Sequence, residues 1–358
     1  MKVSVATVAL VLSSIALLTP SAQATTNYTD ADILQFALNL ECLEAEFYSW
    51  VAYGEGIASV DSSLVGSNSQ LTTSNSGGHA PPSSFTSTPA GILALEIATE
   101  IAENEISHVR YLRKALTAAG ATPVPCPQLS LSPATFLNAA TAAVSAAGAT
   151  INPSATFDPY SFPDAFYLGA FIFEDVGVTA YKGAVRSLQS QEYAAVAAGI
   201  MAIEAGHAAV IRNQLYGQID AGSGLTDNSG ADITIGTAVS GITKLRDNLA
   251  GTAAENALTR NTVAVGSTPS TTGPDLFAAD SDAIAFTRTP SQVLDIVQFS
   301  PSTQALAVGG FFPNGPTGNA DVLEISGDST RTCNSGVLSM ASMSAVSVAV
   351  MAAVALAM

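Results

Sequence analysis

The sequence predicts an all-α protein, an antiparallel four-helix bundle with a long crossover between its second and third helices and a largely irregular C-terminal extension. Apolar residues recur at spacings of three and four in four long segments. The middle two of these segments are separated by residues 117–163, which is long enough for a crossover. Beyond about residue 220 the chain becomes rich in Gly, Thr, Ser and Asp, which is typical of irregular structure.

The first two helices are expected on either side of a long loop. The first runs from Thr29 to Tyr53, with Thr29 or Asp30 as its N-cap. Residues 54–90 are rich in Ser, Thr, Gly and Asn and form the loop, in which His79 is interpreted as an ordinary loop residue because it has no partner at a ligand spacing. The second helix is expected from about Pro89 to residue 120.

The crossover and the second helix pair follow. One further helix is expected within the crossover, over residues 133–149. The third bundle helix is expected to run without interruption from near Asp164 to residue 188, and the fourth spans 191–219 after a short turn. The extension contains one helical patch near 238–251 and short apolar runs, and it is expected to wrap the bundle.

Both ends of the chain resemble targeting segments, and together with the helices they predict four regions. Residues 1–24 have the layout of a secretory signal peptide, with cleavage after Ala24, and residues 25–220 form the bundle. Residues 221–332 form the extension. Residues 333–358 form an apolar tail without charge, for which a GPI-attachment signal is favoured over a membrane-spanning helix. The protein is therefore expected outside the cell or on its surface, in contact with the membrane only through this tail or a lipid anchor.

Charge and cysteine content restrict the class of protein. The chain has 29 acidic and 12 basic residues and a formal net charge of -17, so nucleic acid is excluded as a partner. Three cysteines are too few for a disulfide scaffold. Cys42 either pairs with Cys126 or is a small core residue. The sequence does not indicate an oligomeric state.

Two of the three histidines follow a glutamate by three positions, in the tetrapeptides EISH (105–108) and EAGH (204–207). Residues three apart on a helix differ by about 60° around its axis, so both side chains point to one place. Both pairs fall on apolar helix faces without Lys or Arg, where a carboxylate needs a cation to offset its burial. Glu105, His108, Glu204 and His207 are therefore candidate metal ligands.

The other two helices each supply one inward glutamate. Glu41 and Glu174 lie on apolar faces, and each precedes a tyrosine by seven positions, Tyr48 and Tyr181. The tyrosines either donate hydrogen bonds to the glutamates or are ordinary core aromatics. Glu44 lies one turn from Glu41, which is preferred as the ligand because its spacing to a tyrosine matches that of Glu174. Two lone glutamates and two ExxH pairs are the ligand set of a ferritin-like dinuclear carboxylate site.

Several segments resemble the desiccation-related proteins of plants and algae, a branch of the ferritin-like superfamily. They are NLECLEAEFYSWVAYG, EISHVRYLRKAL, FDPYSF, AIEAGHAAVIRNQLY, AIAFTRTPSQVLDIV and GGFFPNGPTGN. A weaker resemblance to rubrerythrin covers AENEISH and the E-x6-Y spacing. The resemblance implies a ferritin-like bundle, export and a role in stress.

These observations predict two iron or manganese ions, because most of the ligands are hard oxygens. In this interpretation Glu41 and Glu174 are terminal ligands, Glu105 and Glu204 bridge the ions, and one histidine completes each position. The expected activity is an oxidoreductase acting on peroxide or dioxygen, with no catalytic residue assigned besides the ligands. The alternative is a non-enzymatic stress-protective surface or wall protein with a structural or vestigial metal site.

Overall fold

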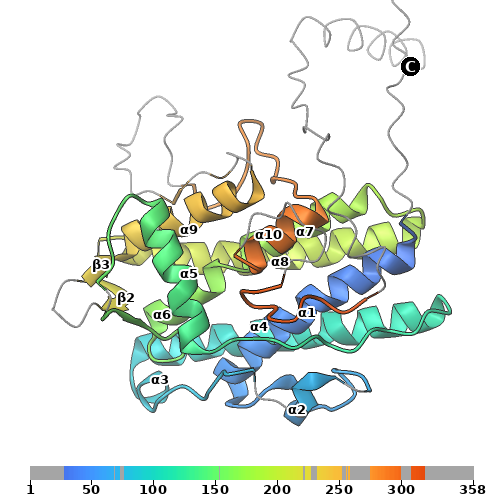
Figure 1. Cartoon of the computed structure of the whole chain (residues 1–358), viewed down its shortest axis with the longest axis horizontal. Coiled ribbons are helices and arrows are strands. Elements are labelled where there is room, and N and C mark those ends of the chain that lie inside the picture. The colour runs from blue at the N-terminus through green and yellow to red at the C-terminus, as the bar shows by residue number, and fades with distance from the viewer. Residues whose placement is uncertain are drawn as a thin grey trace, which may run out of the picture.

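The structure is a computed structural model and describes residues 28–318, apart from 68, 73–75, 153, 221, 227–231, 252–254, 256, 259–274 and 300–307. The predicted signal peptide and apolar tail lie outside the described residues and stay predictions, as do the domain boundaries. Four bundle segments dominate the described part (Figure 1): α1 (Asp30–Tyr53), α4 (Pro89–Ala118), α6 (Pro163–Phe171) with α7 (Glu174–Val185), and α8 (Gln191–Gln218). α1 packs along α4, and α7 packs along α8.

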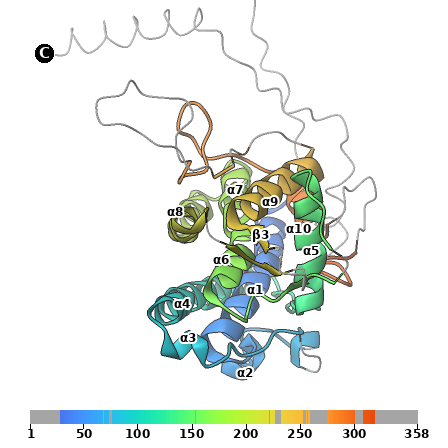
Figure 2. The same ribbon diagram turned by 90° about the vertical axis from the view of Figure 1, so that its left-hand side faces the viewer.

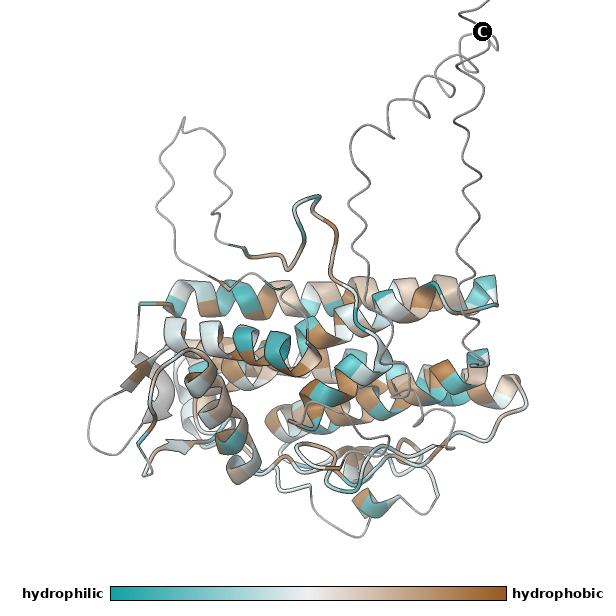
Figure 3. Cartoon of the chain, turned by 45° about the horizontal axis from the view of Figure 1, so that its top comes forward, coloured by the Kyte–Doolittle hydropathy of each residue, from teal (hydrophilic) through white to brown (hydrophobic). Residues whose placement is uncertain are grey.

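Local signals set the ends of these helices. The Thr29 side chain caps α1 in a reciprocal capping box with Asp32, and Gly54 ends the helix in the left-handed conformation with φ 73°. Thr88 caps α4 ahead of a proline at its first position, and Ser190 caps α8. By length and composition α8 could cross a membrane, but its buried Glu204, His207 and Arg212 place one face in the bundle interior. Along the ribbons, hydrophobic and hydrophilic residues alternate as one-sided burial requires (Figure 3).

The third bundle helix differs from its prediction, because it is two helices rather than one. Ile172 and Phe173 separate α6 from α7, and their backbone N–H groups bond three residues back, to Gly169 and Ala170, at 3.2 and 2.9 Å. The apolar pattern continues through this point, and neither Ile172 nor Phe173 is of a residue type that would predict a break; Gly169, the nearest glycine, lies within α6. At this interruption the Phe171 carbonyl accepts a hydrogen bond from Arg246, in the C-terminal part of the chain.

The crossover and the extension cover one side of the bundle (Figure 2). The predicted crossover helix is α5 (Pro133–Ala146), and it packs against α9 (Ile235–Ala250), which is the predicted helical patch of the extension. A second helix of the extension, α10 (Pro290–Val297), packs on α9 and α7. Strand β1 (Thr156–Phe157) of the crossover pairs antiparallel with β2 (Gly222–Thr226), which pairs with β3 (Asp232–Thr234). The short elements are α2 (Ile57–Val60), η2 (Gln70–Thr72) and α3 (Ser84–Ser87).

A disulfide joins the bundle to the crossover. Cys42 of α1 bonds to Cys126, across a sequence separation of 84 residues. The first of the two alternatives for Cys42 is therefore the observed one. Because a crosslink across a long loop removes conformations from the unfolded chain, this bond stabilises the bundle.

Candidate metal centre

Six predicted ligand side chains converge in the centre of the bundle. α1 supplies Glu41, α4 supplies Glu105 and His108, α7 supplies Glu174, and α8 supplies Glu204 and His207. The glutamates are 0–1% exposed, whereas the two histidines are 7–8% exposed. Within the described part of the chain the carboxylates are therefore enclosed, and the histidines are slightly more exposed than they are.

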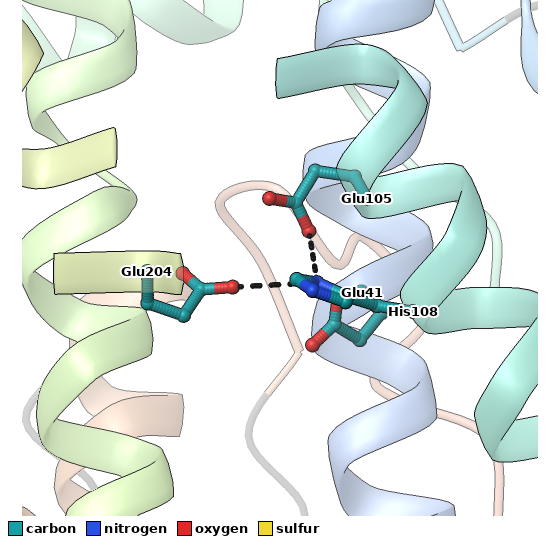
Figure 4. Close-up of side chains that lie close together, drawn as sticks. All are labelled: Glu41, Glu105, His108 and Glu204. Atoms are coloured by element: carbon teal, nitrogen blue, oxygen red, sulfur yellow. Dashed lines mark hydrogen bonds and ion pairs between the residues drawn. The ribbon is translucent and has the colours of Figure 1, made fainter. Parts of the chain in front are cut away.

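Glu105 lies between the two histidines. Its Oε2 is 3.2 Å from His108 Nδ1, and its Oε1 is 3.0 Å from His207 Nδ1. Figure 4 shows Glu105 and His108 projecting from one helix toward Glu204 on another. One carboxylate is thus shared between the two halves of the site.

The remaining glutamates divide between the halves. His108 Nδ1 is 3.2 Å from Glu41 Oε2 and 3.7 Å from Glu204 Oε1. His207 Nδ1 is 3.4 Å from Glu174 Oε2. Two groups result in which one ligand atom per residue lies within 4.8 Å of the others: a first ligand group of Glu41, Glu105, His108 and Glu204, and a second ligand group of Glu105, Glu174, Glu204 and His207. The groups share Glu105 and Glu204.

The donor atoms of these groups fit a metal ion. Within the described residues, six of their buried atoms have no hydrogen-bond partner: Glu105 Oε1, Glu174 Oε2, both Glu204 oxygens and both His207 nitrogens. His207 Nδ1 is close to Glu105 but is not aligned for a hydrogen bond. Such buried polar groups cost free energy unless a cation or hydrogen bond satisfies them. In the described part of the chain the only ion-pair partners of these glutamates are the two histidines.

The pKa values show how this cluster behaves without a metal. Burial raises the pKa of Glu41 to about 7 and that of Glu204 well above its ordinary range. Burial also acts on Glu105, but the adjacent imidazoles lower its pKa below the ordinary value. Burial favours neutral imidazoles, yet the neighbouring carboxylates raise the pKa of His108 and of His207 to about 10. The metal-free site therefore holds excess protons, which metal binding must release.

The two tyrosines link opposite halves of the site. The Tyr48 hydroxyl of α1 donates to Glu174 Oε1, and the Tyr181 hydroxyl of α7 donates to Glu41 Oε1. Both tyrosines are buried. Glu41 and Glu174 are thus each oriented by the helix that carries the other one, which is a way to fix a carboxylate in one direction.

Glu44 lies beside the site but outside both ligand groups. It is buried, and burial raises its pKa well above the ordinary range. Its counterpart in the second half of the chain is Gly177, which follows Glu174 by three positions as Glu44 follows Glu41. A Cβ added at Gly177 would lie 2.3 Å from Glu204 Oε2 and 3.3 Å from Glu44 Oε1. The missing side chain at Gly177 provides the space that these two carboxylates occupy.

Replacing Gly177 with alanine is expected to displace Glu204 and weaken metal binding by about tenfold or more, because Glu204 belongs to both ligand groups. Titration of the metal-free variant with Mn²⁺ measures this. Gly206→Ala on α8 is the matched control, since nothing lies within 4 Å of a Cβ built there. Equal affinities of the two variants would contradict the steric role of Gly177.

The sequence patterns did not indicate a buried ion network around Asp175. Arg212 and Arg246 both pair with this carboxylate, and Arg246 also pairs with Glu255. Two features of the sequence could have indicated this network. The chain has only 12 basic residues, and one of them, Arg212, lies on a strongly apolar helix. His79 stays outside the site, with its Nε2 3.0 Å from Asp158 Oδ2.

The sequence resembles known proteins over most of its length. The model of the ferritin-like domain family matches residues 29–217. The desiccation-related protein PCC13-62 of Craterostigma plantagineum is 30% identical over 296 residues, which cover 82% of this chain and 85% of that protein. The ferritin-like catalase Nec2 of Nesocodon mauritianus is 30% identical over 296 residues, covering 81% and 84% respectively. No solved structure matches. The chain therefore belongs to the ferritin-like family, in the group that includes the desiccation-related proteins.

Proposed function

We propose that this chain binds two iron or manganese ions and is an oxidoreductase that acts on hydrogen peroxide. The observation that carries the proposal is the pair of ligand groups that share Glu105 and Glu204. A set of four glutamates and two histidines from four helices is the ligand set of dinuclear carboxylate proteins. Hard oxygen donors favour iron or manganese over zinc.

The residues would have distinct roles around the two ions. Glu105 and Glu204 would bridge them, because each belongs to both groups, while Glu41 and Glu174 would each bind one ion. Tyr48 and Tyr181 would hold those terminal glutamates in place through their hydrogen bonds. Two bound ions would supply two-electron redox chemistry, in which one hydrogen peroxide is oxidised to dioxygen and two protons and a second, with two protons, is reduced to two waters.

The burial of the site supports a small reactant. In the described part of the chain the glutamates are 0–1% exposed and the histidines 7–8%, so an organic substrate has little of the site to contact. Peroxide and dioxygen are small reactants that need little contact surface. The word catalase in the name of the Nec2 relative favours peroxide between these two.

We also propose that the protein is exported, with a C-terminal lipid anchor if the tail is an attachment signal. The disulfide between Cys42 and Cys126 supports export, since such bonds persist in oxidising compartments. A second candidate function, non-enzymatic protection during drying, is favoured by the name of the PCC13-62 relative.

The proposals are tested by elemental analysis and intact-mass measurement of the protein after secretion from cells of its source organism. About two iron or manganese ions per chain are expected, because there are two ligand groups. The intact mass should match a chain that begins at Thr25 and lacks the apolar tail. A stable metal-free protein would contradict the metal centre. Two bound ions without peroxide consumption would instead support the non-enzymatic role.

A further inference from the structure

Five buried charged side chains surround the interruption between α6 and α7. We call Asp175, Arg212, Arg246, Glu255 and Arg288 the break network. Asp175 lies on α7, Arg212 on α8 and Arg246 on α9, while Glu255 and Arg288 belong to the segments between α9 and α10. All five are at most 8% exposed. Burying so many charges is costly unless each is paired, so the network calls for an explanation.

Arg246 is the member that bonds to the backbone before the interruption and to the carboxylate after it. Its Nη2 lies 2.9 Å from Asp175 Oδ2, and its Nη1 donates to the carbonyl oxygen of Phe171, the last residue of α6. Its guanidinium also lies over the Phe171 ring, 4.5 Å from the centroid. Arg212 holds both oxygens of Asp175, with Nε 2.9 Å from Oδ1 and Nη2 2.9 Å from Oδ2, and its guanidinium lies over the same Phe171 ring, 5.2 Å from the centroid.

These contacts lie on either side of a proposed metal ligand in the chain. Glu174 is the first residue of α7 and lies between Phe171 and Asp175 in the chain. A backbone held at both of these points determines where α7 begins and hence where the Glu174 carboxylate points. Planar guanidinium groups suit this task because they donate several hydrogen bonds in fixed directions.

In the other half of the site, a disulfide takes the position that the break network has beside Glu174. Glu41 occupies the position that matches Glu174, and the next residue, Cys42, is bonded to Cys126 of the crossover. Each terminal glutamate is therefore followed directly by a residue tied to the layer outside the bundle. One tie is a disulfide and the other is an ion network.

We propose that Arg246 is a positioning residue for Glu174, so that the C-terminal extension helps to form the second ligand group. This inference rests on the proposed metal centre. Arg246 acts through Asp175 and the Phe171 carbonyl and touches no ligand itself. The extension, which lies outside the four bundle helices, thereby contributes to the second metal position.

Arg246→Met and Arg288→Met form a matched pair of variants for testing this. Both arginines are 1–2% exposed, both pair with Glu255, and each has an Nε without a hydrogen-bond partner in the described structure. The break network has three arginines and two carboxylates, so either substitution leaves its formal charges balanced. Of these two arginines in the described structure, Arg246 is the one that contacts Asp175 and Phe171, whereas Arg288 donates to Thr179 Oγ1 at 3.0 Å, further along α7.

The experiment titrates the metal-free full chains with Mn²⁺ in a calorimeter. The wild type should take up two ions, and Arg246→Met should bind one of them about 10–100-fold more weakly, the loss typical for residues that orient ligands. Arg288→Met should bind both within about threefold of the wild type, although thermal unfolding should show a comparable loss of stability. In a His207→Ala background, which already lacks the second position, Arg246→Met should cause no further loss of Mn²⁺ affinity.

The outcomes separate the two proposals. A wild type that binds no Mn²⁺ overturns the metal centre and this inference with it. A wild type that binds two ions while Arg246→Met and Arg288→Met behave alike overturns the inference alone. If Arg246→Met does not fold, Arg246→Lys keeps the charge but cannot reach both Asp175 and Phe171, and an unchanged second affinity in that variant also overturns the inference.

Discussion

Replacing Glu105 with glutamine is expected to abolish the binding of both metal ions and the consumption of peroxide. Glu105 is shared by the two ligand groups, with one oxygen 3.2 Å from His108 and the other 3.0 Å from His207. The amide keeps the shape of the side chain but loses the negative charge that offsets the metal cations. The loss should exceed the roughly 10–100-fold that follows removal of a supporting residue.

Two variants make the Glu105 result specific. Glu103 lies on the same helix but is exposed, so Glu103→Gln should leave the binding of both ions and the activity unchanged. His207 belongs to the second ligand group alone, so His207→Ala should lose the ion of that group and retain the ion of the first group. Calorimetric titration and oxygen release from peroxide measure the two effects. Full metal content in Glu105→Gln would refute its bridging position.

The second large effect concerns the metal-free protein, which should lose stability as the pH rises from about 5 to about 8. Burial raises the pKa of Glu41 from its ordinary 4.5 to about 7 in the folded chain. A carboxyl with a raised folded pKa contributes stability below its unfolded pKa, and this contribution is lost as the pH rises through the folded value. Burial raises the pKa of Glu174 and of Glu204 in the same direction.

The size of this effect follows from linkage. For Glu41 alone, the shift to about 7 corresponds to a loss of about 2–3 kcal/mol between about pH 5 and about pH 8. The raised pKa of His108 acts with the same sign, because a protonated imidazole is favoured in the folded state until the pH approaches 10. The lowered pKa of Glu105 has the opposite sign, but its contribution is already in place above its ordinary range.

Urea unfolding of metal-free and Mn²⁺-loaded protein across this pH range measures the difference. The loaded protein should show a much flatter pH dependence, since bound cations replace the protons of the cluster. Glu41→Gln is the informative variant, because it removes one of the titrating groups and should reduce the slope of the metal-free protein. A slope that does not change on metal removal would contradict a metal site at these residues.

The sequence was sufficient to predict the bundle and to choose the residues that meet at its centre. Helical spacing placed four long segments, and two ExxH pairs with two lone glutamates indicated side chains that the structure brings within 4.8 Å of their group members. Their convergence could be predicted because each of these side chains lies on the apolar face of its own helix, while their role as metal ligands stays a prediction. Glu105 and His108, for example, need only one turn of α4 to converge.

Features that depend on contacts between distant segments were beyond the sequence patterns. The third helix was predicted to be continuous, yet it is interrupted after Phe171, where Arg246 of α9 binds the freed carbonyl. The same limit applies to the extension, whose helices α9 and α10 pack on α5 and α7. Periodicity describes the face of one helix and contains no information about which remote arginine will reach it.

The space beside Gly177 also bears on how the two halves of this chain relate. The repeat of E-x6-Y and E-x2-H suggests interchangeable halves, but position 44 carries a glutamate where position 177 carries no side chain. A molecule made of two first halves would place a second carboxylate where Glu204 and Glu44 already lie. One made of two second halves would leave that volume unfilled. The halves are thus a complementary pair, and neither could be doubled to replace the other.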